Sequence, residues 1–108
     1  MKKLFIIYAL IFFATTVYAD DYKTCKVNNT TGSVVVNTFD LSDDTVQVTF
    51  ANDTEIYVNV TAQIRLNSNE ADRTITKMVA PRSETTVNLK RSIKGVSKVI
   101  SVSGTKCQ

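Results

Sequence analysis

Residues 56–66 alternate strictly between apolar and polar side chains, and this pattern limits the fold more than any other feature of the sequence. The apolar positions are Ile56, Val58, Val60, Ala62, Ile64 and Leu66. A helix cannot use such a pattern, because its apolar stripe recurs about every 3.6 residues, whereas successive side chains of a strand point to opposite faces. The segment therefore predicts a long strand with one buried face and one face in water.

The rest of the chain after residue 20 is rich in valine, isoleucine and threonine, which fit a pleated, half-buried surface. Further strands are predicted at 22–27, 33–39, 45–51, 74–80, 85–90 and 96–103. The run Val34, Val35 and Val36 predicts a strand buried on both faces. About seven short antiparallel strands indicate an all-β domain, and we expect a small immunoglobulin-like β-sandwich, with a small barrel as the alternative.

The first 19 residues are typical of an export signal. A basic start at Lys2 and Lys3 precedes an apolar run over 4–17, and Ala19 supplies a small residue before Asp20. A membrane-spanning helix needs roughly 20 apolar residues, which is more than this run provides. We therefore expect a cleaved signal peptide (1–19), then one domain (20–108) that is secreted or periplasmic and does not span a membrane.

Two cysteines, Cys25 and Cys107, lie near the two ends of the predicted domain. A domain of this length has a small hydrophobic core, and exported domains of this kind often carry a covalent cross-link. An oxidising compartment favours a disulfide between the two residues, with free thiols as the alternative. On the chain-entropy argument a loop this long stabilises the fold by about 4–5 kcal/mol.

The composition excludes several kinds of chemistry. Without histidine the chain has no Ser/His/Asp or Cys/His nucleophile system and no zinc site that uses imidazole. Its three glycines form no phosphate-binding loop. Nucleic acid is an unsuitable partner for an exported chain that has no aromatic residues interleaved with its basic ones. We therefore expect no enzymatic activity and no cofactor.

Acidic residues gather in two predicted loops. Asp40, Asp43 and Asp44 lie in the first loop, and Asp53 and Glu55 lie in the second. Carboxylate catalysis on sugars needs two carboxyl groups about 5–10 Å apart, but consecutive loops of a meander lie at opposite ends of a sheet. A calcium site at the first loop is an alternative, since hard cations take clustered oxygens. The preferred interpretation is solvated turn acids and no metal.

Basic residues gather towards the C-terminus. The candidates for binding an anionic partner are Arg82, Lys90, Arg91, Lys94 and Lys98. Such a partner would be an anionic polysaccharide or an acidic surface of another exported protein. The alternative role is solubility and protection of sheet edges, for which Lys77 and Lys98 lie inside predicted strands.

Tyr57, Asn59 and Thr61 share the polar face of the longest predicted strand and form a candidate ligand face. Together these features predict an exported, non-catalytic binding protein that recognises another exported or surface protein or an anionic polysaccharide. The alternative is a structural subunit that self-associates on a surface or in a filament. Its driving force would be unequal charge, because residues 20–55 carry two basic and seven acidic residues, whereas 56–108 carry nine and three.

Overall fold

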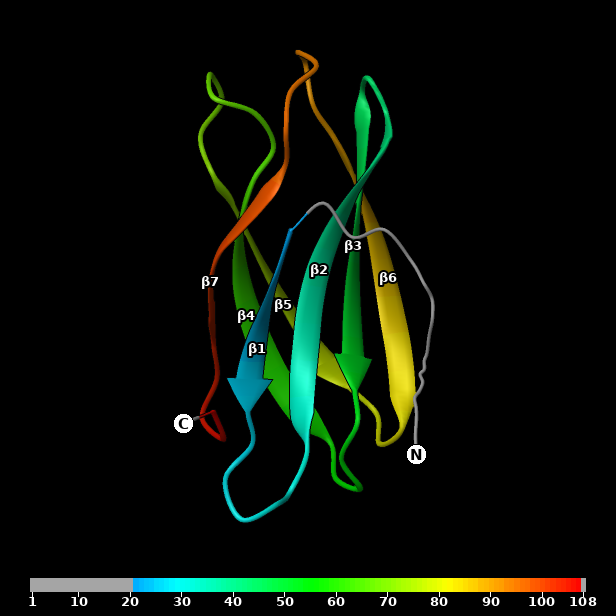
Figure 1. Cartoon of the computed structure of the whole chain (residues 1–108), viewed down its shortest axis with the longest axis vertical. Coiled ribbons are helices and arrows are strands. Elements are labelled where there is room, and N and C mark those ends of the chain that lie inside the picture. Colours follow the sequence, from blue (N-terminus) through cyan, green and yellow to red (C-terminus); the bar gives the residue numbers. More distant parts are fainter. Residues whose placement is uncertain (1–20, 108) are drawn as a thin grey trace.

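The computed structural model describes residues 21–107 as seven antiparallel strands in two sheets (Figure 1). The strands are β1 (Asp21–Lys26), β2 (Ser33–Ser42), β3 (Thr45–Asn52), β4 (Val58–Arg65), β5 (Arg73–Val79), β6 (Ser83–Lys90) and β7 (Lys98–Ser103). The predicted all-β fold is confirmed, and each predicted strand has its counterpart. The predicted signal peptide, residues 1–19, lies outside the described residues.

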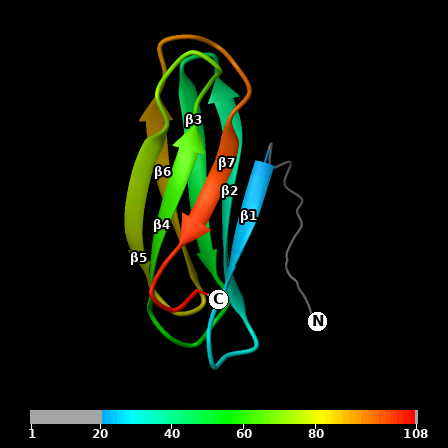
Figure 2. The ribbon, with the colours of Figure 1, turned by 90° about the vertical axis from the view of Figure 1, so that its left-hand side faces the viewer.

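The strands divide into a sheet of four and a sheet of three. The first sheet has the order β1-β2-β3-β6 and the second has the order β5-β4-β7, and Figure 2 shows them as two packed layers. In the constant-type immunoglobulin order the third strand belongs to the second sheet. Here β3 continues the β1–β2–β3 meander and β4 is the first strand to cross, so the strand order differs from that arrangement.

The hydrophobic core lies between the two sheets and is built from the alternating positions of each strand. The largest fully buried side chains are Phe50, Ile64 and Leu66. Along β2, Val34 and Val36 are fully buried, but Val35 is only half-buried on the outer face. The prediction that β2 is buried on both faces was therefore wrong, because β2 belongs to an antiparallel sheet that is covered on one side only.

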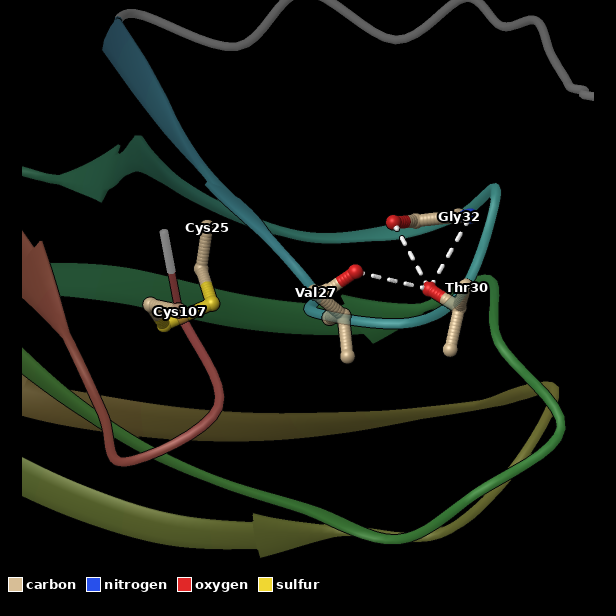
Figure 3. Close-up of a disulfide and its surroundings, with 5 residues drawn as sticks. All are labelled: Cys25, Val27, Thr30, Gly32 and Cys107. Carbon is tan, nitrogen blue, oxygen red and sulfur yellow. Dashed lines mark hydrogen bonds between the residues drawn. A yellow bond between two sulfur atoms is a disulfide. The ribbon is translucent and has the colours of Figure 1, made fainter.

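The ends of the described chain are tied together by a disulfide between Cys25 and Cys107, which confirms the predicted pairing. Their Cα atoms are 5.1 Å apart, and an isolated bridge pairs Val27 with Cys107 beside them (Figure 3). The disulfide thus links β1 to the segment after β7. The turn that follows β1 is closed by Thr30, whose hydroxyl donates to the Val27 carbonyl at 3.0 Å and accepts from the Gly32 N–H at 3.2 Å.

Candidate functional site: the three-loop end

Three loops meet at one end of the sandwich, which we call the three-loop end. They are residues 43–44 between β2 and β3, 66–72 between β4 and β5, and 91–97 between β6 and β7, and they lie at the top of Figure 1. Loops held on a rigid scaffold are common carriers of binding residues. The three-loop end is therefore the candidate site.

Arg91 is the residue that joins the three loops. Only 5 % of Arg91 is exposed, and it begins the loop after β6. Its guanidinium group donates five hydrogen bonds of 2.8–3.0 Å. The acceptors are the Asp40 carboxylate and the main-chain carbonyls of Ser42, Asp43, Leu66 and Gly95. A planar group with five donors suits this task, because one side chain satisfies carbonyls from several segments.

A second connection joins the loop 66–72 to the loop 91–97. Asn67 is buried, and its side-chain amide donates to the Ile93 carbonyl at 2.8 Å while its oxygen accepts from the N–H groups of Asn69 and Glu70. The Glu70 carboxylate in turn accepts from the hydroxyl and the N–H of Ser92. The hydroxyl of Ser92, followed by its N–H, lowers the pKa of Glu70. Both loops are thereby fixed to each other as well as to Arg91.

The same two loops approach each other too closely for a side chain at Gly95. A Cβ atom built there would lie 2.5 Å from the Cβ of Asn67. Beside this contact the surface forms an open hollow of about 800 Å³. The residues that line it are Arg65, Asn67, Ser68, Glu70, Ala71, Asp72, Gly95, Val96 and Lys98. An ion pair of 3.1 Å between Arg65 and Asp72 forms part of this lining.

Aliphatic side chains are exposed at this end. Leu41 is 50 % exposed, Ile93 is 49 % exposed and Val96 is 66 % exposed. Leu41 lies where the register of β2 against β3 shifts between Asp40 and Ser42, and such bulges redirect side chains. None of these three residues was among the predicted site residues. Leu41 and Ile93 are aliphatic residues in segments predicted as loops, which was the available signal, whereas Val96 was predicted as the first residue of the last strand.

The predicted basic group is divided by the fold. Lys90, Lys94 and Lys98 come to the three-loop end, since they lie at the end of β6, in the following loop and at the start of β7. Arg91 is buried among carbonyls, so it does not belong to an exposed cationic surface. Arg82 lies at the opposite end of the sandwich, in the turn between β5 and β6.

The predicted acidic loops are indeed at opposite ends. Asp40 pairs with Arg91 at 2.9 Å, and Asp44 pairs with Lys90 at 3.7 Å. The hydroxyls of Ser42 and Thr45, and then the charge of Lys90, lower the pKa of Asp44. Among residues 21–107 no group of three or more histidine, cysteine, aspartate and glutamate side chains could hold a metal ion. The calcium alternative for Asp40, Asp43 and Asp44 therefore has no support from the geometry.

Ion pairs also connect the acidic and basic halves of the sequence. Asp40 and Asp44 pair with Arg91 and Lys90 at the three-loop end. At the opposite end Arg82 pairs with Asp53 and Glu55. The unequal charge of the halves is thus partly compensated within one molecule, which weakens the alternative prediction of charge-driven association.

The candidate ligand face is brought together as the alternation predicted. Tyr57 precedes β4 and is 60 % exposed, and Asn59 is exposed on the same outer face of the three-stranded sheet. The Thr61 hydroxyl lies 2.8 Å from the hydroxyl of Thr76 on β5. This face is open and lies apart from the three-loop end.

Within the described part of the chain, no helix is long and apolar enough to cross a membrane. Comparison of the chain with protein-family models, curated sequences and solved structures finds no match.

Proposed function

We propose that the chain is an exported, non-catalytic binding protein that recognises another exported or surface protein through its three-loop end. The observation that carries the proposal is that Leu41, Ile93 and Val96 are exposed at an end whose loops buried Arg91 holds in place. A single exposed aliphatic residue is ordinary, but several at one ordered end mark a contact surface. Because the loops are already fixed, binding does not have to order them, and this saves conformational entropy.

The chemistry of the three-loop end favours a protein partner over a polysaccharide. Aliphatic side chains there stand beside Lys90, Lys94 and Lys98, so the best fit is a surface that offers apolar side chains rimmed by acidic ones. An anionic polysaccharide would use the lysines but would leave Ile93 and Val96 against a polar ligand. Lys90 is in addition engaged by Asp44.

The proposed compartment is the extracellular space or the periplasm. The disulfide between Cys25 and Cys107 is consistent with an oxidising compartment. The basic and apolar start of the sequence supports export through a signal peptide that ends at Ala19. Intact-mass measurement of the secreted or periplasmic protein should show a chain beginning at Asp20 that is lighter than its reduced form by the mass of two hydrogen atoms.

A binding role without catalysis is part of the same proposal. Both cysteines are used in the cross-link, and the acidic loops lie at opposite ends with Asp40, Asp44 and Glu55 in ion pairs. The immunoglobulin-like architecture is proposed only in the sense of layers: sheets of four and three strands present loops at their ends, as variable domains do.

The experiment is capture from the native compartment with matched variants. The full coding sequence is expressed with an affinity tag, and captured proteins are quantified by mass spectrometry for wild type and for a variant with Ile93→Ser and Val96→Ser. A variant with Tyr57→Ser and Met78→Ser, which removes two exposed apolar side chains elsewhere, is the control. We expect one partner in stoichiometric amount with wild type and control, and at least a tenfold loss with the loop variant.

Two results would contradict the proposal. One is equal capture by the loop variant and wild type. The other is loss of the partner only when Tyr57 and Met78 are changed, which would place recognition on the outer face of the three-stranded sheet.

A further inference from the structure

Strand β6 is the one edge of the sandwich that carries neither a covering segment nor an inward charge among the described strands. The two sheets have four edge strands, β1 and β6 in one sheet and β5 and β7 in the other. An edge strand offers N–H and C=O groups to another chain unless the fold blocks it. Only an edge that the fold leaves unblocked can therefore accept another strand.

Strands β1 and β7 cover each other. Asp21 at the start of β1 accepts a hydrogen bond of 2.9 Å from the N–H of Val99 on β7. At their other ends the Val27–Cys107 bridge and the disulfide join the two segments. Neither edge is open along its length to an additional strand.

Strand β5 is protected by charge. Lys77 lies in register with Val60, whose side chain is fully buried, so Lys77 is on the inner face of its sheet. A charged residue on the inner face of an edge strand is a common defence against strand addition, because a pairing strand would have to cover the charge. Edge protection is one of the two roles predicted for Lys77, and its position on an edge strand supports that role.

Strand β6 differs on both counts. Its eight residues pair with β3 without a register shift, from Lys90 opposite Thr45 to Ser83 opposite Asn52. The inner-face positions of β6 carry no charge, and Val87 and Leu89 pack against the core. The strand is therefore regular along its whole length.

The register shows which residues direct their main chain to that edge. The Arg91 N–H donates to the Asp44 carbonyl at 3.0 Å, which continues the β3–β6 ladder by one pair. Hydrogen-bonded and non-bonded pairs alternate in an antiparallel ladder, so Lys90 has its N–H and C=O on the other side, away from β3. The contact of the Arg73 side chain with the Lys90 carbonyl, at 3.1 Å from β5, agrees with this direction. The residues directed to the free edge are Glu84, Thr86, Asn88 and Lys90.

We propose that β6 pairs with β6 of a second copy of this chain in an antiparallel, two-fold symmetric dimer centred on Val87. In that register Glu84 lies opposite Lys90 of the second copy, and Thr86 lies opposite its Asn88. Both charges are exposed on the outer face of the same sheet, so the dimer contains the Glu84–Lys90 contact twice, with Lys90 shared between Glu84 of the second copy and Asp44 of its own chain at 3.7 Å. Isologous pairing of this kind closes on itself and does not continue into a fibre.

Charge complementarity selects this register among the alternatives. Outward-directed residues must face outward-directed residues, so the strand can slip only in steps that move the centre from Val87 to Thr86 or Asn88. Centring on Thr86 would place Glu84 opposite Asn88, and centring on Asn88 would place it opposite Ser92. Only the centre at Val87 sets opposite charges against each other at both ends of the strand.

The contact from Arg73 does not prevent this pairing. A carbonyl oxygen has two lone pairs, so the Lys90 carbonyl can accept from Arg73 and from an added strand. The antiparallel arrangement also places the two three-loop ends at opposite poles of the dimer. Lys90 borders the three-loop end, but Glu84 and Thr86 lie away from it on β6, so changes at these two residues test the dimer without altering the proposed recognition surface.

The test is sedimentation equilibrium of the oxidised protein, expressed from its complete coding sequence, at concentrations up to about 1 mM, where a millimolar dimer is populated. The variants are Glu84→Lys, Lys90→Glu and the double exchange Glu84→Lys with Lys90→Glu. Each single change sets like charges opposite each other at two symmetric places, and we expect the Kd of the dimer to rise about tenfold. The double exchange restores opposite charges and should return the Kd to near the wild-type value.

Two further variants make the result specific to the edge. Thr86→Pro removes an outward N–H without touching the ladder to β3, so it should abolish the dimer while thermal unfolding remains cooperative. Lys26→Glu, an exposed charge change on β1, is the control and should leave the Kd unchanged. A wild-type protein that stays monomeric overturns the proposal, as does a dimer that withstands Thr86→Pro. Failure of the double exchange to recover affinity overturns the register.

Discussion

Replacing Arg91 by methionine tests whether one buried guanidinium group holds the three-loop end together. Methionine keeps much of the length of the side chain but removes all five donors. Four main-chain carbonyls and the Asp40 carboxylate would lose the hydrogen bond that Arg91 gives them. Because Arg91 is 5 % exposed, this substitution removes one member of a buried ion pair.

The magnitude follows from those contacts. Breaking a buried pair by removing one partner costs about 3–5 kcal/mol, and a buried carbonyl without a donor costs about 1–3 kcal/mol unless water reaches it. The Asp40 side chain is 25 % exposed and the loops are at the end of the sandwich, so water recovers part of both costs. We therefore expect Arg91→Met to lower the free energy of unfolding by about 3–4 kcal/mol. That is a large share of the 5–15 kcal/mol typical of small domains.

The assay is urea unfolding of the oxidised protein, followed by far-ultraviolet circular dichroism, with Arg82→Met as the matched control. Arg82 forms ion pairs of 3.3 and 3.7 Å with Glu55 and Asp53, but its side chain is 62 % exposed, so its loss should cost about 0–1 kcal/mol. A difference between the two variants of less than about 1 kcal/mol would refute the reasoning that burial and carbonyl contacts make Arg91 special.

Three further predictions concern other contacts. Changing Cys25 and Cys107 to serine should remove up to about 4–5 kcal/mol of stability, and reductant should lower the Tm of the wild type but not of this variant. Asn52→Ala should cost about 2–4 kcal/mol in urea unfolding, because its buried amide joins carbonyls of two loops, whereas exposed Asn88→Ala should cost under about 0.5 kcal/mol. The pKa of Glu70 is lowered in the folded state by its hydrogen bonds from Ser92. The stability that these bonds contribute is therefore fully present above the unfolded pKa of about 4.3, and is lost as pH falls through the folded pKa. Wild type should therefore lose stability more steeply than Glu70→Gln below about pH 4.3, and equal slopes would contradict this.

The strands could be predicted from the sequence because their signal is local. The alternation over 56–66 reports which side chains share a face, and a strand needs no knowledge of its neighbours to show it. The cross-link between Cys25 and Cys107 was predictable for a different reason, since two cysteines after the predicted signal peptide offer one pairing. These parts of the fold follow from patterns that involve few residues.

The assignment of strands to sheets could not be read in the same way. Period-two alternation is identical whether β3 turns back into its own sheet or crosses to the other one. The partial exposure of Val35 follows from that choice, because its side chain lies on the uncovered face of the four-stranded sheet. The three-loop end depends on it as well, because Arg91 finds its acceptors only when β2, β4 and β6 bring their ends together.

Arg91 shows why charged residues mislead when a sequence is read alone. Basic residues are rarely buried, so Arg91 was grouped with the lysines around it as a surface residue. Burial is favourable only when almost every donor finds an acceptor, and the acceptors here are main-chain carbonyls that any sequence supplies. The types of the residues near Arg91 in the sequence therefore do not predict that main-chain carbonyls will surround its guanidinium group.

Ordered loops alone do not single out the proposed binding end, because both ends of the sandwich are fixed by a buried polar side chain. At the opposite end the Asn52 amide donates to the carbonyls of Ile56, Val79 and Ala80, and its oxygen accepts from Thr54. The loops there present Arg82 paired with acidic residues, whose charges are already compensated. The three-loop end is equally fixed but exposes aliphatic side chains, which gain from burial against a partner. What the loop tips present, and not their rigidity, therefore distinguishes the two ends.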